Sequence, residues 1–290
     1  MQLSTRTTVA GAALALTTLA APAVTLVGIT SQNQITRIDS ANISAATTVA
    51  ITGLAAGDRF VGIDLRPKDN KIYGVTLSNQ IYTVDELTGA TSLVAALSSN
   101  VINPALGYGI DFNPVADFGT GASLRLLSSA GANLAINAST GVVGNATNTI
   151  ASGFSGAAYS NSSPLPTAAP ASTTLYYINS NSDTLQMASS AFNTPTITTV
   201  GALGVDVLKA SGFELLADGS AFAALNVDDG SSLLTGIYSI NLGTGAATLI
   251  GNYNGTLSGL TVSAVPEPQT WALMACGLLG LGFLARRRQG

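Results

Sequence analysis

The most regular pattern in the chain is a short alternation of apolar and polar residues that ends on a turn. It reads Ile-Tyr-Thr-Val-Asp-Glu-Leu-Thr-Gly over residues 81–89 and returns over residues 134–141 and 237–245. Alternating β-branched and aromatic residues predict a strand. Asp or Asn followed three residues later by Thr-Gly predicts a turn, because the Asx side chain caps it and glycine accepts positive φ. Residues 34–39 and 175–179 are predicted as weaker copies of the same hairpin.

The hairpins belong to a longer repeat. The threonines of the three clear copies lie 52 and 104 residues apart, which is one period and two. A second signature, Gly-Ile-Asp-x-x-Pro, occurs at Gly62–Pro67 and again at Gly109–Pro114. Each unit is predicted as three or four antiparallel strands over roughly 45–50 residues, which is typical of a propeller blade.

These units predict an all-β fold, a β-propeller of about five blades, with six blades or an open β-solenoid as alternatives. The first unit lacks its opening strand, and a spare strand at residues 255–262 follows the last unit. Pairing of the two would close the ring and protect the sheet edges. The predicted units are residues 26–54, 59–97, 107–150, 153–203 and 211–253.

The composition supports a large core and excludes several kinds of chemistry. Apolar residues make up 47% of the chain and charged residues 9%. There is no histidine, which excludes the usual Ser-His-Asp catalysis and His-ligated metal sites. The single cysteine, Cys276, lies near the C-terminus, so the body has no disulfide or thiolate nucleophile. We therefore expect a protein that is not an enzyme and has no obligatory cofactor.

The body is acidic. Residues 24–265 hold seven Lys/Arg and fourteen Asp/Glu, a net charge near −7. Nucleic-acid binding needs a basic face, so no nucleic-acid partner is expected.

The N-terminus predicts export. One cation, Arg6, precedes an apolar run over residues 9–21, and Ala-Pro-Ala follows at residues 21–23. This order is typical of a secretory signal peptide over residues 1–23, removed by signal peptidase.

The C-terminus combines three elements. Val265-Pro266-Glu267-Pro268 is followed by fifteen uncharged residues, 271–285, and then by Arg286, Arg287 and Arg288. A short apolar helix with cations at its end predicts a stop-transfer segment whose arginines stay in the cytoplasm. This tail resembles the PEP-CTERM sorting signal over residues 265–290. The resemblance implies a Gram-negative exosortase as partner, a transient inner-membrane anchor, cleavage near the Pro-Glu-Pro motif, and a final place at the cell surface, outer membrane or outside the cell.

The body, residues 24–264, also resembles an uncharacterised family of secreted bacterial domains often found on such sorting-signal proteins. The likeness rests on Thr25–Thr30, Gly62–Pro67 and Ile72–Gly89. It implies a propeller-like repeat fold and a location, but no specific activity.

Asp64 and Asp111 are the candidate site residues of the body. Equivalent positions of successive blades ring the axis, so their carboxylates are expected to lie near one another and could hold calcium. The alternative is structural: each Asp would cap the turn to the proline three residues on. Recurrence favours the structural role, because repeats replicate structural devices.

Two functions remain open. The first is a non-catalytic surface or matrix module that binds exopolysaccharide or protein, linked to biofilm as sorting-signal proteins often are. The second is a calcium-assisted propeller hydrolase, similar to a lactonase, that uses the axial carboxylates.

Overall fold

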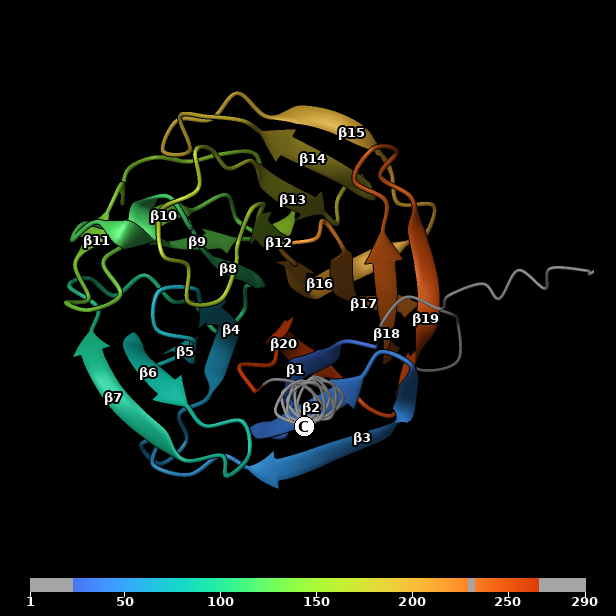
Figure 1. The fold of residues 1–290 in the computed structure, drawn as a ribbon, viewed down its shortest axis with the longest axis horizontal. Coiled ribbons are helices and arrows are strands. Elements are labelled where there is room, and N and C mark those ends of the chain that lie inside the picture. Colours follow the sequence, from blue (N-terminus) through green and yellow to red (C-terminus); the bar gives the residue numbers. More distant parts are fainter. Residues whose placement is uncertain (1–22, 229–232, 266–290) are drawn as a thin grey trace, which may run out of the picture.

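The protein is a ring of five four-stranded antiparallel sheets around a central axis (Figure 1). This computed structural model describes residues 23–228 and 233–265. The predicted five-bladed propeller is confirmed, and the open solenoid is not formed.

The strands of each blade follow one another from the axis outward. Blade one holds β20 (Leu257–Val262), β1 (Thr25–Thr30), β2 (Gln34–Asp39) and β3 (Asn42–Ala50). Blade two holds β4 (Phe60–Arg66), β5 (Lys71–Thr76), β6 (Gln80–Val84) and β7 (Thr91–Ala96). Blade three holds β8 (Tyr108–Phe112), β9 (Leu124–Ser128), β10 (Asn133–Ile136) and β11 (Val143–Gly144). Blade four holds β12 (Phe154–Tyr159), β13 (Leu175–Asn179), β14 (Thr184–Ala188) and β15 (Thr198–Ala202). Blade five holds β16 (Val207–Leu215), β17 (Ala221–Asp228), β18 (Leu233–Ile240) and β19 (Ala247–Tyr253).

The ring closes through blade one, which uses both ends of the body. Strand β20 pairs antiparallel with β1, placing Leu26 opposite Val262 and Gly28 opposite Leu260. The predicted pairing of the last strand with the first unit is therefore confirmed. It completes the four-stranded sheet of blade one and ties the end of the body to its beginning.

The core lies between the blades, where inner strands approach closely. A Cβ on Gly109 would come 2.9 Å from the backbone nitrogen of Ala157 on the next blade. A Cβ on Gly62 would come 2.7 Å from the side chain of Ile110. The glycine of the Gly-x-Asp signature is therefore needed for inner strands to pack side by side.

The Asx-x-x-Thr-Gly turns also join neighbouring blades. The Asp85 carboxylate accepts hydrogen bonds from the backbone N–H of Leu87 and of Thr88, at 2.9 and 2.8 Å. Gly141 closes the equivalent turn of blade three with a φ of 74°. A Cβ there would collide with the carbonyl oxygen of Ala96 on blade two. The turn thus needs glycine both for its backbone conformation and for its contact with the preceding blade.

Blade four departs from the prediction. Residues 175–179, predicted as a copy of the turn-ending strand, form β13, the second strand of the blade. The third strand is β14, and a longer loop over residues 189–197 replaces the Asx-x-x-Thr-Gly turn. The prediction was wrong because the apolar alternation is shared by all middle strands. Blade five also begins earlier than predicted, at Val207.

Within residues 23–228 and 233–265, helix is confined to the 3₁₀ turn η1 (Ala116–Phe118). No helix in that part of the chain is long and apolar enough to cross a membrane. The predictions for residues 1–22, for Pro266, Glu267 and Pro268, for the transmembrane helix and for Arg286–Arg288 lie outside the described residues.

Candidate functional site: the axial carboxyl cluster

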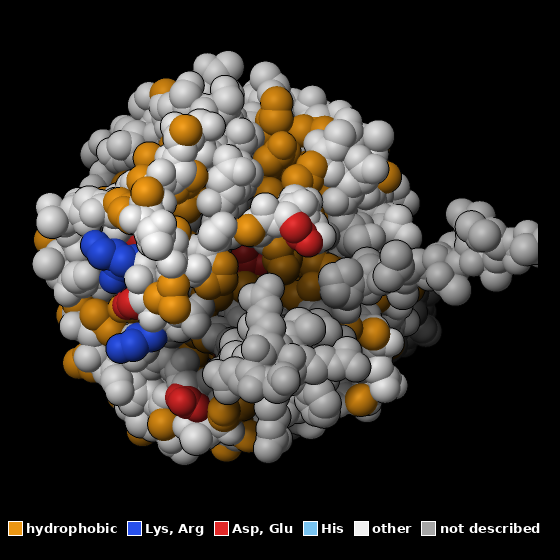
Figure 2. Space-filling model, viewed as in Figure 1, with side chains coloured by type: hydrophobic (Ala, Val, Ile, Leu, Met, Phe, Trp, Pro, Cys, Tyr) orange, Lys and Arg blue, Asp and Glu red, His pale blue; other side chains and the backbone are white. Residues whose placement is uncertain are grey.

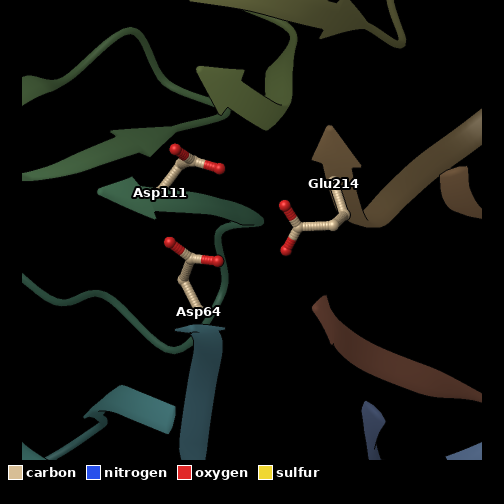
Figure 3. Close-up of side chains that lie close together, drawn as sticks. All are labelled: Asp64, Asp111 and Glu214. Atoms are coloured by element: carbon tan, nitrogen blue, oxygen red, sulfur yellow. The ribbon is translucent and has the colours of Figure 1, made fainter. Parts of the chain in front are cut away.

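Three buried carboxyl groups meet on the propeller axis. They are Asp64 on β4, Asp111 on β8 and Glu214 on β16, each at most 4% exposed. Their side chains point toward a common centre (Figure 3), where one oxygen of each lies within 4.8 Å of the others. They form the one cluster of candidate metal ligands among the described residues.

The cluster is part of a ring of hydrogen bonds between blades. Each side chain accepts the backbone N–H that follows the equivalent residue of the next blade. Phe112 donates to Asp64 at 2.8 Å, and Tyr159 donates to Asp111 at 3.1 Å. Val262 donates to Glu214 at 3.3 Å, and Leu65 donates to the Thr261 hydroxyl at 2.9 Å.

Blade four is the exception in this ring. It carries Ala158 at the equivalent position, and alanine has no acceptor for the next blade. The ring therefore consists of two aspartates, one glutamate and one threonine.

Thr261 shows that the cluster holds protons. Its hydroxyl oxygen lies 2.7 Å from Glu214 and 3.0 Å from Asp64, and it also accepts from Leu65. A hydroxyl has one proton to donate. It can donate to one carboxylate, so the other contact requires a proton on the carboxyl group itself.

The electrostatics agree with this proton count. Burial raises the pKa of Asp64 well above its ordinary value, and the charge of Glu214 raises it further. Burial also raises the pKa of Asp111 well above its ordinary value, with further increases from the charges of Asp64 and Glu214. Burial raises the pKa of Glu214, while the Thr261 hydroxyl opposes the shift. Like charges this close cannot all ionise at once.

A small cavity of about 250 Å³ reaches the cluster from the face where the inner strands end. Glu214 lines it, together with apolar groups such as Leu65, Pro67 and Val262. On the face seen in Figure 2, acidic atoms appear deep in the central hollow and the surrounding surface carries few charges. The axis therefore offers a carboxyl group at the bottom of an apolar opening.

Sequence reasoning found part of this site. The structure brings Asp64 and Asp111 to the axis as expected, but neither caps the turn to its own proline. Their oxygens accept hydrogen bonds from the backbone of the next blade, so the predicted cap of each aspartate on its own turn is not formed.

Glu214 and Thr261 were missed. Both stand two residues after a glycine, like Asp64 and Asp111. The glycines occupy positions 62, 109, 156, 212 and 259, so successive ones are 47 residues apart except for one step of 56. That glycine spacing is the signal that identifies the ring.

A second carboxylate holds the end of the body. Glu86 is 4% exposed and accepts hydrogen bonds from the hydroxyl of Ser263 and the N–H of Ala264, both at 2.7 Å, and from the N–H of Val265 at 3.2 Å. Arg37 pairs with the same carboxylate at 2.9 Å. Val265 begins the predicted sorting motif, so the body is anchored up to that motif.

Fold and site define an all-β, five-bladed propeller whose inner strands are joined by side chains on the axis, with a sorting signal directly after the last strand. The chain belongs to the family described as domain of unknown function (DUF4394), whose model matches residues 25–261. The PEP-CTERM protein-sorting motif matches residues 264–288. The protein is therefore exported, passes through a membrane-anchored stage and is processed by an exosortase.

Comparison with solved structures finds similar chains at low sequence identity. The calcium-binding protein regucalcin from Agrobacterium tumefaciens strain C58 is 13% identical, with a TM-score of 0.38 over 80% of this chain and 68% of that one. A chain of the nidogen/laminin complex is 12% identical, with a TM-score of 0.46 over 83% of this chain and 98% of that one. No curated protein matches the sequence.

Proposed function

We propose that the processed propeller is a non-catalytic module that binds exopolysaccharide at the cell surface or in the extracellular matrix. The observation that carries this proposal is the ring on the axis. Asp64, Asp111 and Glu214 each accept a backbone N–H from the neighbouring blade, so the groups best suited to chemistry are engaged in holding the ring together.

The anchoring of the tail supports a role after processing. Glu86 holds residues 263–265 against blade two, and Asn70 donates to the carbonyl oxygen of Ala264 at 2.8 Å. A cut beyond Val265 would leave every strand and all of these contacts in place. The domain that reaches the outside would then be the complete propeller.

The surface suits a glycan better than a charged macromolecule. Seven cations and fourteen acids are spread over residues 24–265, and serine, threonine and asparagine supply much of the remaining polarity. Hydroxyl and amide groups match the hydrogen bonds of sugar hydroxyls. We expect binding through loops on the faces of the ring.

A glycan array with the purified protein tests this function. We expect binding to at least one class of bacterial polysaccharide, retained when Asp64 and Asp111 are both replaced by Asn. An array on which the folded protein binds no glycan would remove the proposal.

The second candidate is a calcium-assisted hydrolase, favoured by three carboxyl oxygens within 4.8 Å of one another and by the cavity that reaches Glu214. Calcium takes six to eight oxygen ligands. The three carboxyl groups and the Thr261 hydroxyl would supply part of that set, and the cation would have to displace the protons that the cluster holds. Stoichiometric calcium binding in calorimetry, together with hydrolysis of a lactone that Asp111→Asn abolishes, would favour this candidate over the binding module.

A further inference from the structure

A second cavity lies between blades three and four, and none of the three axial carboxyl groups lines it. Its volume is about 440 Å³, within the range of about 300–1,000 Å³ typical of small-molecule sites. Buried residues Arg125 and Tyr159 line it, while Ala122, Asn193 and Thr194 are exposed. We call it the Arg125 cavity.

Arg125 is a buried cation with neutral partners. It is 5% exposed and donates to Tyr159 Oη at 3.2 Å, Asn133 Oδ1 at 3.0 Å and Asn193 Oδ1 at 2.9 Å. The ion pairs of the described residues are Arg37 with Glu86 and Arg66 with Asp117, so Arg125 has no carboxylate partner there. A buried charge without an opposite charge beside it is strongly destabilising.

The acids nearest in the fold are already engaged. Asp111 lies opposite Arg125 in the β8–β9 pair, but its carboxyl group belongs to the axial cluster and accepts from Tyr159 N–H. Asp117 pairs with Arg66 at 2.8 Å and accepts from the Ser123 hydroxyl at 2.9 Å. Neither group neutralises the guanidinium.

The cavity also retains hydrogen-bonding capacity. A guanidinium has five N–H groups, and three of those on Arg125 have acceptors among the described residues.

The cavity exists because blade four breaks the repeat. The loop over residues 189–197 stands where three other blades have the Asx-x-x-Thr-Gly turn. Blade three holds this loop, since Asn133 donates to the carbonyl oxygen of Phe192 at 2.9 Å and Asn148 to that of Asn193 at 3.0 Å. The Phe192 ring meets the Tyr159 ring edge-on, with centroids 5.1 Å apart.

We propose that the Arg125 cavity binds the carboxylate of an acidic sugar, with the guanidinium of Arg125 as the anion-binding group. A planar carboxylate fits the fork of an arginine, and a charge-assisted pair is strongest where water is excluded. The anion supplies the charge that the protein leaves uncompensated.

The rest of the lining selects for a sugar. Asn113, Ser123, Asn193 and Thr194 present amide and hydroxyl groups around the charge, and Phe192 adds an apolar surface for a ring face. This step rests on the proposed function, because it names the ligand class of the glycan-binding module. The experiment is chosen so that the two can fail separately.

The test is isothermal titration of the purified protein with trigalacturonate and with its fully methyl-esterified form, which has the same sugars without the charge. We expect trigalacturonate to bind at least about tenfold more tightly, a difference of about 1.4 kcal/mol. Arg125→Gln should remove this preference. The exposed Arg59→Gln, an identical change in charge outside the cavity, should keep it.

A second variant, at the exposed edge of the cavity, keeps the test valid if Arg125→Gln fails to fold. Ala122 is exposed and lines the cavity, so Ala122→Glu places a competing carboxylate at the mouth without disturbing a buried contact. It should weaken trigalacturonate binding by at least about tenfold. Equal affinity for acid and ester, or full binding by Ala122→Glu, would overturn the proposal. Binding of neutral glycans alone would overturn it while leaving the proposed function standing, whereas a blank glycan array would remove the function itself.

Discussion

Asp64 on the inner strand of blade two accepts a hydrogen bond at 2.8 Å from the backbone N–H of Phe112 on the inner strand of blade three. A side chain of one blade thus satisfies a buried backbone group of the next. The same relation joins Asp111 to Tyr159 and Thr261 to Leu65. The propeller is therefore held by directed bonds at its centre, in addition to apolar packing between sheets.

Thr261 is the member of the ring with the clearest test. Thr261→Val keeps the shape but removes the acceptor for Leu65 N–H and the donor to the carboxyl groups. A buried group left unsatisfied costs about 1–3 kcal/mol, so we expect a loss of that size in the free energy of unfolding by urea. Thr261→Ser keeps the hydroxyl and should lose less. Equal losses in the two variants would show that the hydroxyl contributes nothing.

Asp111 makes stability depend on pH. Its raised pKa means that the folded protein binds a proton that the unfolded chain releases above about pH 4. The contribution to stability is full below that pH and is lost as pH rises through the folded pKa. The melting temperature should therefore fall as pH rises above about pH 5, and Asp111→Asn should flatten the slope.

Asp85 serves as a comparison for Asp111, because its pKa is shifted in the opposite direction. Hydrogen bonds from Thr88 lower its pKa, so its contribution is present above about pH 4 and is lost as pH falls below it. It does not titrate in the window used for Asp111. Stability that rises with pH across the window, or an unchanged slope in Asp111→Asn, would contradict the assignment.

We predict that Glu86 holds residues 263–265, directly before the sorting motif, in a fixed conformation. Glu86→Ala removes the acceptor for Ser263, Ala264 and Val265 and leaves Arg37 without its partner. We expect amide hydrogen exchange at Ala264 and Val265 to accelerate at least about tenfold. Asp39→Ala removes an exposed carboxylate that caps its own hairpin turn through Ala41 and should leave exchange at these residues unchanged. Equal exchange in Glu86→Ala and the native protein would show that other contacts hold the segment.

Gly141 tests the contact between turns and preceding blades. Gly141→Ala combines a φ of 74° with a collision against the Ala96 carbonyl. Gly219 has a φ of 87°, and a Cβ there meets nothing within 4 Å. Gly219→Ala should cost about 1 kcal/mol from backbone strain alone, and Gly141→Ala clearly more. Similar melting temperatures for the two variants would argue against the interblade contact.

The sequence predicted the repeat and the ring closure because both appear as patterns within short segments of the chain. Alternation in Ile81–Val84 and the turn ending at Gly89 identify a hairpin without knowledge of its neighbours. The same patterns misplaced Leu175–Asn179, since second and third strands share one apolar pattern. Glu214 and Thr261 also follow a signature glycine by two residues, but neither is an aspartate. The sequence therefore did not show that these positions are equivalent to Asp64 and Asp111.

No residue pattern around Arg125 predicted the Arg125 cavity. Arg125 comes within hydrogen-bond distance of Asn193 only because the inner strands of blades three and four pack side by side and the loop after β14 folds over blade three. Contacts of this kind depend on interblade geometry, which a repeat pattern does not encode. The departure of blade four from the repeat was the available hint.

Thermal unfolding with and without calcium tests whether the axial carboxyl groups join blades or form a metal-dependent catalytic centre. It compares the native protein with the triple variant Asp64→Asn, Asp111→Asn, Glu214→Gln at about pH 8. We expect no calcium shift in the native protein and a triple variant at least as stable, because its isosteric side chains avoid buried like charges. A calcium-induced rise of more than about 4 °C, roughly 1 kcal/mol or more, seen in the native protein and absent in the triple variant, would contradict it.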